Sequence, residues 1–194
     1  MSNVDVSEKY SLNSESKPSP EKLVELGLHP IEVDIVSRLH SEAVGLVGSN
    51  DSEWTRTFLD TLRQLGETQD PPRLCFPNQL SGQWEKGGEW IFDLAWVECN
   101  KDESGEFDWR LSERLILACE SEWRTGQYYV LEDFFKLTFV RSEYRLFIYS
   151  HKITDGNSPV DWCKNVCPPS LDNRYLAIGI STDQKDFYLD SWTR

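Results

Sequence analysis

Leu115-Ile116-Leu117-Ala118-Cys119-Glu120-Ser121-Glu122 is the stretch that decides the fold: five apolar residues, then two glutamates around a serine. An uninterrupted apolar run of this length predicts a buried strand. Side chains alternate faces along a strand, so Glu120 and Glu122 share a face with Ile116 and Ala118. Two neighbouring carboxylates at the end of a dry strand are costly unless a cation or a proton compensates them. We therefore expect chemistry at the end of this strand.

The residues around this strand predict a hairpin followed by a crossover. Asp93 interrupts an earlier apolar run, Trp90-Ile91-Phe92-Asp93-Leu94-Ala95-Trp96-Val97, which predicts a strand over 89–98. The polar segment 100–105 connects it to the strand over 112–121 as a hairpin. A helix over 131–141 carries Lys136, and a strand over 144–149 follows it. Parallel pairing of that strand with 112–121 gives a right-handed crossover.

The remaining chain divides into an N-terminal and a C-terminal part. Residues 1–18, rich in Ser, Asn and charge, are expected to form a disordered tail. Three helices are expected over 19–66, beginning at Ser19-Pro20, at Pro30 and after Asn50-Asp51. Residues 67–88 predict a loop because they contain Pro71-Pro72 and Gly87-Gly88. A short helix over 159–166 and strands over 175–181 and 186–192 complete the chain.

This order of elements predicts the fold class. Three helices, a β-β-α-β unit and a final α-β-β unit give an α/β protein with a mixed central sheet flanked by helices. With 194 residues the chain suits a single domain. That domain would span 19–194, with a helical segment at 19–66, a core at 84–150 and a C-terminal helix and hairpin at 151–194.

Charge and composition restrict the function. The formal net charge is −13, so the chain as a whole should repel nucleic acid unless it presents a locally basic surface. We expect no membrane contact, since no apolar stretch approaches eighteen residues, and a cytoplasmic location, since the N-terminus lacks an apolar signal segment. The pair Cys163 and Cys167, with His151 upstream, lacks a fourth zinc ligand, so reduced structural thiols are the better interpretation.

The order of acidic residues resembles a known family. An acid on one strand, a Glu-x-Glu strand end, a helix and a further strand, over about 84–150, resemble the PD-(D/E)XK, or restriction-endonuclease-like, superfamily. Asp93 corresponds to its metal-binding Asp and Glu120 to its first strand-end acid. Glu122 falls where lysine is usual, Phe92 stands where proline is usual, and Lys136 matches variants whose lysine lies on the following helix. The resemblance implies an αββαβ core behind the N-terminal helices.

The resemblance also implies a magnesium or manganese site. Asp93 and Glu120 would bind Mg²⁺ or Mn²⁺ as hard oxygen ligands, with the backbone carbonyl of Ser121 as a further ligand. The metal would lower the pKa of a bound water. Glu122 would orient or deprotonate that water, and Lys136 would stabilise charge on the phosphate.

An acid from a preceding helix often completes such a site. Glu53 is the candidate, Glu42 the second choice, and Glu89 shares strand parity with Asp93.

Each candidate also has a purely structural interpretation. Glu122 can point into water beside Arg124. Asp93 can form a salt bridge with Arg114 or with Lys136. Lys136 can form a surface i, i+4 pair with Glu132, one helical turn before it.

Two functions follow from the sequence. The first is a metal-dependent phosphodiesterase acting on DNA. The alternative is a catalytically inactive protein of the same fold, an interaction or inhibitor module whose acidic surface docks a basic protein. Trp109 and Trp123, at the strand edges, are candidate anchors for such a partner. A structural domain with an accidental acidic cluster is a third reading, and the sequence leaves a homodimer open.

Overall fold

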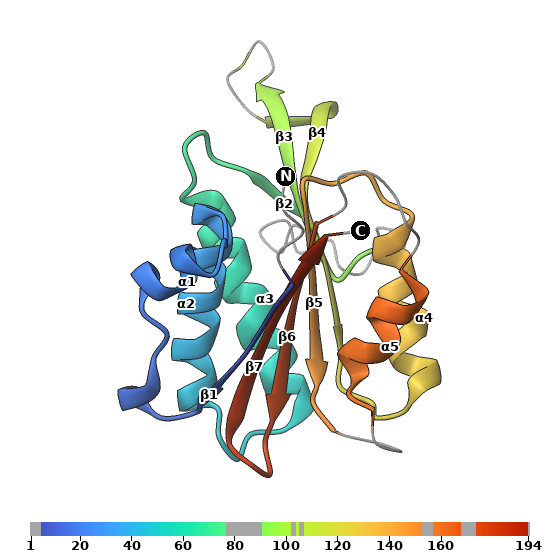
Figure 1. The fold of residues 1–194 in the computed structure, drawn as a ribbon. Coiled ribbons are helices and arrows are strands. Elements are labelled where there is room, and N and C mark those ends of the chain that lie inside the picture. Colours follow the sequence, from blue (N-terminus) through green and yellow to red (C-terminus); the bar gives the residue numbers. More distant parts are fainter. Residues whose placement is uncertain are drawn as a thin grey trace.

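The structure, a computed structural model, describes residues 5–76, 91–101, 104, 107–152, 157–167 and 174–193. These residues form a seven-stranded mixed sheet in the order β1-β7-β6-β5-β4-β3-β2. Helices α1, α2 and α3 cover one face of the sheet, and α4 and α5 cover the other (Figure 1). The predicted α/β class, with a mixed sheet flanked by helices, is confirmed.

The elements have the following bounds. The strands are β1 (Val6–Ser11), β2 (Leu74–Phe76), β3 (Leu94–Lys101), β4 (Phe107–Glu122), β5 (Tyr144–Ser150), β6 (Arg174–Ser181) and β7 (Asp186–Thr193). The helices are α1 (Pro20–Glu25), α2 (Pro30–Gly45), α3 (Asp51–Glu67), α4 (Gln127–Thr138) and α5 (Pro159–Val166), and a short 3₁₀ turn covers Ser14–Ser16.

Local sequence signals explain where most helices begin. The side chain of Ser19 accepts a hydrogen bond from the Lys22 amide at the start of α1. The side chain of Ser158 does the same for Asp161 in α5. Each bond satisfies an amide that has no partner inside the helix. Gly27, with φ of +83°, follows α1 in the left-handed conformation that glycine adopts without strain.

The strands pair as the predicted hairpin and crossover require. β3 and β4 are antiparallel, with Leu94 opposite Cys119. β4 and β5 are parallel, with Glu120 opposite Phe147, and α4 connects them. β5 and β6 are also parallel, joined through α5. The start of β3 and the C-terminal ends of β4, β5 and β6 therefore lie at the same end of the sheet.

From Leu117 to Glu122, alternation along β4 assigns side chains to two cores. Ile116 does not share the face of Ala118 as predicted: it packs with Leu117, because the pairing of β4 with β3 shifts at this point and skips Ile116. Leu117 and Cys119 pack in the core beneath α1, α2 and α3, whereas Ala118 packs beneath α4 and α5 with Phe134 and Phe147. Burying a side chain of phenylalanine size stabilises the fold by roughly 1.5–3 kcal/mol. By the same alternation, the two glutamates at the end of β4 project into the α4 and α5 layer.

The structure corrects the expected tail. Val6–Ser11 is not disordered but forms β1, which pairs antiparallel with β7. Val6 is buried, and the ammonium of Lys9 lies 2.7 Å from a carboxylate oxygen of Asp186. A short polar strand is hard to recognise from local sequence because its stability comes from the neighbouring strand.

Other boundaries also differ from the predictions. Leu74–Phe76, expected to be loop, forms β2 against β3. The strand expected over 89–98 begins only at Leu94, so Asp93 lies in the bend before the strand. α4 begins at Gln127, four residues early, because Gly126 turns the chain with φ of +131°.

Candidate acidic site at the end of the sheet

The structure holds Asp93 against the end of β4, at the residue after Glu120. Oδ2 of Asp93 accepts hydrogen bonds from the backbone amide of Ser121 at 2.8 Å and from its hydroxyl at 2.9 Å. These bonds hold the bend before β3 against the end of β4. The negative charge of Asp93 acts on Glu120, whose pKa it raises. Asp93 makes none of the expected ion pairs among the described residues, and Arg114 contacts Glu98 and Glu143 instead.

Glu120 is the most deeply buried group of the site. Its exposed fraction is 1%. Oε2 accepts a hydrogen bond from Nζ of Lys136 at 3.0 Å, whereas Oε1 is buried and has no hydrogen-bond partner among the described residues. Burial, and then the neighbouring charge of Asp93, raise the pKa of Glu120 to about 8. Oε1 of Glu120 can therefore carry a proton or bind a cation.

Lys136 reaches the site from α4. Its ammonium lies 3.0 Å from Glu120 and 2.7 Å from Oδ1 of Asp133. Burial alone would lower its pKa, but the hydrogen bonds to Asp133 and Glu120 outweigh burial and raise it. Among the described side chains, Lys136 is therefore paired with the site rather than with Glu132.

Glu122 is held by an arginine. Nε of Arg124 donates to both carboxylate oxygens, at 3.1 and 3.0 Å, and the Arg124 amide donates to Oε1 at 2.7 Å. Burial opposes ionisation, yet these bonds lower the pKa of Glu122. The predicted contact with Arg124 is present, but Glu122 is buried and does not point into water.

Asp133 is a site residue that sequence reasoning missed. Its side chain is 15% exposed, contacts Lys136, and forms a hydrogen bond with the carboxyl group of Glu122. Burial raises the pKa of Asp133 most, and the negative charge of Glu122 raises it further. The charge of each of two carboxyl groups in contact disfavours ionisation of the other. The i, i+3 spacing of Asp133 and Lys136 on one helix face was the available signal.

The site carries more negative than positive charge. Four carboxyl groups, Asp93, Glu120, Glu122 and Asp133, surround the two cations Lys136 and Arg124. When all six groups are ionised, two negative charges remain without a partner. Two bound protons or one divalent cation would neutralise this excess.

Mg²⁺ and Mn²⁺ prefer hard oxygen ligands such as carboxylates. Asp93 and Glu120 are hard oxygen donors, and Oε1 of Glu120 lacks a partner among the described residues. Mg²⁺ is commonly bound by one or two carboxylates, with water and substrate phosphates as its other ligands. Across the described ranges, no group of three or more His, Cys, Asp or Glu residues is arranged to hold a metal ion. The metal site at Asp93 and Glu120 stays a prediction, and the expected third acid, Glu122, is turned towards Arg124.

The acids expected to complete the site have other positions. Oε2 of Glu53 accepts a hydrogen bond from the Asn50 amide at 3.2 Å, so Glu53 belongs to the N-terminal cap of α3. Glu42 is exposed on α2. Glu89 lies outside the described residues. The backbone carbonyl of Ser121 stays a predicted ligand.

Two further predictions concern Trp and Cys residues. Trp123 packs against Trp54, with ring centroids 5.7 Å apart, so it belongs largely to the core rather than to a partner surface. The side chain of Trp109 lies outside the described residues. Cys163 and Cys167 are buried free thiols, as expected.

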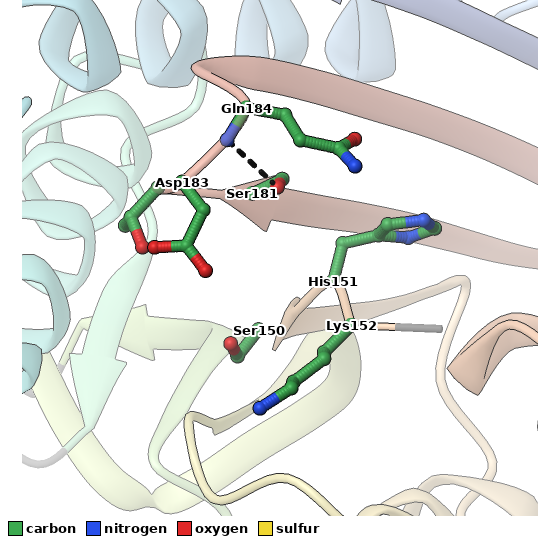
Figure 2. Close-up of a pocket in the computed structure, with 7 residues that line it drawn as sticks. Ser150, His151, Lys152, Ser181, Asp183 and Gln184 are labelled. Carbon is green, nitrogen blue, oxygen red and sulfur yellow. Dashed lines mark hydrogen bonds between the residues drawn. The ribbon is translucent and has the colours of Figure 1, made fainter. Parts of the chain in front are cut away.

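A polar hollow lies at the same end of the sheet, next to β5 and β6. It has a volume of about 210 Å³ and lies where β5 and β6 end, around Ser150, Lys152, Ser181 and Asp183 (Figure 2). Ligands of parallel α/β sheets commonly bind outside the carboxyl ends of the strands. The hollow was not predicted, because it forms where two segments thirty residues apart in the sequence meet.

No helix within the described ranges is long and apolar enough to cross a membrane. Comparison with protein-family models, with curated proteins and with solved structures finds no match to this chain.

Proposed function

We propose that the protein is a metal-dependent nuclease of the PD-(D/E)XK type that hydrolyses phosphodiester bonds in DNA. The observation that carries the proposal is the pairing of Asp93 with the end of β4, next to a buried Glu120 that has one oxygen without a partner among the described residues. The antiparallel β3 and β4, the α4 crossover and the parallel β5 support the same assignment.

In this proposal Asp93 and Glu120 hold Mg²⁺ or Mn²⁺. The bound ion would supply a water of lowered pKa and would stabilise the leaving oxygen. The protein contributes Lys136, whose ammonium faces Glu120 and is placed to stabilise charge on the phosphate. Asp133 positions that ammonium from one helical turn away.

Glu122 contacts Arg124 and is not free to serve as the general base that the family resemblance implied. Its carboxylate fixes Arg124, whose side chain is 58% exposed and can meet a phosphate at the mouth of the site. A general-base role for Glu122 stays a prediction, and it requires Arg124 to move towards the substrate. The negative net charge makes such a local cation necessary for an approaching anion.

Calorimetry with Mn²⁺ tests the metal site. We expect wild-type protein to show one-site heat and Glu120→Ala to show none. Asp190→Asn is the matched control, because it removes a buried strand carboxylate that also contacts a helix lysine. Cleavage of single- and double-stranded DNA, with Mg²⁺ and with Mn²⁺, tests the activity. Absence of both heat and cleavage in the wild type would refute the proposal.

The interaction module is a second candidate, and an exposed aromatic row on α4 favours it. Tyr128 and Phe139 are 71% and 84% exposed, and Phe135 stacks on Phe139 with ring centroids 6.5 Å apart. Exposed aromatic groups of this size commonly mark partner surfaces. With a net charge of −13, the complementary partner is a basic protein. This candidate predicts wild-type protein that binds no Mn²⁺ and leaves DNA intact.

A further inference from the structure

A cation–π pair lies at the mouth of the acidic site. The guanidinium carbon of Arg124 is 4.2 Å from the ring centroid of Tyr129, near the start of α4. At this distance the negative face of the ring attracts the guanidinium. The exposed ring of Tyr128 meets Tyr129 edge to face, with centroids 5.5 Å apart. Arg124, Tyr128 and Tyr129 together form a surface that we call the aromatic platform.

Direct contacts connect the aromatic platform to the acidic site. Nη2 of Arg124 lies 3.9 Å from Oδ2 of Asp133, whose Oδ1 lies 2.7 Å from the ammonium of Lys136. That ammonium lies 3.0 Å from Glu120. Tyr129, Asp133 and Lys136 also have the i, i+4, i+7 spacing of one helix face and span about 10 Å along α4. The platform therefore adjoins the position that the proposed function gives to the phosphate.

The guanidinium of Arg124 is held in place before any ligand binds. Its Nε donates to both carboxylate oxygens of Glu122, at 3.1 and 3.0 Å, and its Nη2 donates to Oε2. A bidentate pair of this kind fixes the orientation of the planar group. The ring of Tyr129 covers one side of the guanidinium, yet the Arg124 side chain is still 58% exposed, and Nη1 has no acceptor among the described residues. The other side and the Nη1 edge are thus open to a ligand, at a reduced entropic cost.

This arrangement suits a flat ligand with a π system. Unpaired nucleobases stack on aromatic side chains and on guanidinium planes. Stacking does not depend on a positively charged surface, which matters in a chain with a net charge of −13. A paired base inside a duplex is covered on both faces by its neighbours, and it can stack on a protein only after it leaves the helix. The platform therefore distinguishes unpaired from paired DNA.

We propose that the aromatic platform binds an unpaired base that flanks the scissile phosphate, so that the protein acts on single-stranded DNA or unpaired strand ends in preference to paired duplex. The base stacks on the open side of the Arg124 guanidinium, which Tyr129 supports from the other side, and the Nη1 edge donates to a phosphate of the same strand. The inference rests on the proposed function and adds the substrate class to it.

The test measures DNA binding by fluorescence anisotropy in protein that carries Asp93→Asn and Glu120→Gln. These amides remove both proposed metal ligands, so the DNA is not cleaved, and they remove the two negative charges that exceed the cations of the site. We expect a labelled single strand to bind at least tenfold more tightly than a duplex of the same sequence. An abasic strand of equal length should bind as weakly as the duplex.

Two further substitutions, made in the same protein, test the platform itself. Arg124→Lys keeps the charge but removes the plane, and we expect it to weaken single-strand binding about tenfold, as the loss of one stacked base does. Tyr129→Leu, which keeps an apolar side chain without a ring, should act in the same direction. Neither should weaken binding of the abasic strand further. Phe139→Leu is the matched control, because it replaces an exposed ring at the far end of α4.

Full single-strand affinity in Arg124→Lys, or an equal loss on the abasic strand, would overturn the inference. Duplex binding as tight as single-strand binding would also overturn it. Because the amide variant needs neither metal nor cleavage, the binding test separates the two proposals. Wild-type cleavage that is equal on duplex and single strand, and that Arg124→Lys leaves intact, would keep the nuclease and remove the platform from it. Base-dependent binding by a protein whose wild type cleaves no DNA would reject the nuclease alone.

Discussion

Two buried pairs of a strand acid and a helix lysine lie in the same layer of this protein. Glu120 of β4 meets Lys136 of α4 at 3.0 Å, and Asp190 of β7 meets Lys164 of α5 at 3.3 Å. Both acids lie on one row across the sheet, because Glu120 is opposite Phe147, and Asp190 is opposite Ala177, which is itself opposite Phe147. The two pairs are nearly equivalent in position.

They differ in what surrounds them. Asp190 also forms a hydrogen bond with Ser7, so its charge has two partners. For Glu120, the charge of a second acid, Asp93, raises its pKa. Glu120 also shares its lysine with a third acid, Asp133, and keeps a buried oxygen without a described partner. A buried acid with enough partners is a structural element, whereas a buried acid in a cluster of excess negative charge is a candidate ligand site.

The largest expected difference between the two pairs is in activity. Asp93→Asn should lower metal-dependent DNA cleavage by about 100-fold or more, the scale on which active sites lose rate when one electrostatic group is removed. Asp190→Asn should leave the rate near the wild-type value. Initial rates with Mn²⁺ measure both variants, and circular dichroism verifies that each is folded. Equal losses in the two variants would make the acidic cluster a structural feature.

The pair of Asp190 and Lys164 should contribute to stability rather than to activity. Lys164→Met leaves the buried carboxylate of Asp190 with Ser7 as its main partner, and we expect it to lower the free energy of unfolding by about 3 kcal/mol. The double variant with Asp190→Asn should recover most of that loss. Urea unfolding measures both. Recovery of less than a third would mean that the packing of the lysine stem, and not the charge, carries the effect.

A smaller effect concerns pH. The pKa of Glu120 is about 8 in the folded protein and about 4.5 when unperturbed, so the folded protein holds its proton more tightly than the unfolded chain. This contribution to stability is fully present below pH 4.5 and is lost as pH rises through 8. Between pH 6 and 8, without metal, we expect the ionisation of Glu120 to lower the free energy of unfolding by roughly 2 kcal/mol.

Thermal melts at both pH values test this contribution. Glu120→Gln should flatten the pH dependence, whereas Glu132→Gln, which changes an exposed glutamate on α4, should leave it unaltered. A wild-type profile equal to that of Glu120→Gln would show that Glu120 ionises normally.

The smallest expected effect is at the mouth of the site. The side chain of Arg124 is 58% exposed, so Arg124→Gln should change the free energy of unfolding by less than about 1 kcal/mol. If the guanidinium contacts the substrate, DNA affinity should fall by more than stability does. Fluorescence anisotropy with a labelled oligonucleotide, alongside urea unfolding, compares the two. A fall in stability without a change in affinity would make Arg124 a purely structural partner of Glu122.

The sequence alone was sufficient for the elements whose signals are local. The apolar run before Glu120, the helix that follows and the strand at 144–149 predicted the parallel pair β4 and β5. The short helix expected over 159–166 has the bounds that the structure shows for α5. These elements carry their own signals in hydrophobic period and capping residues, which act over a few neighbouring positions.

Only the tertiary structure decided the partners of each charge. The sequence indicated Asp93, Glu120 and Lys136 as one site, but it could not show that Glu122 turns to Arg124 or that Asp133 joins the cluster. It also gave no sign that Val6–Ser11 pairs with β7. The physical reason is common to these cases: a buried charge or an edge strand takes its conformation from groups remote in sequence, and the choice among several nearby partners depends on distances that only the folded chain defines.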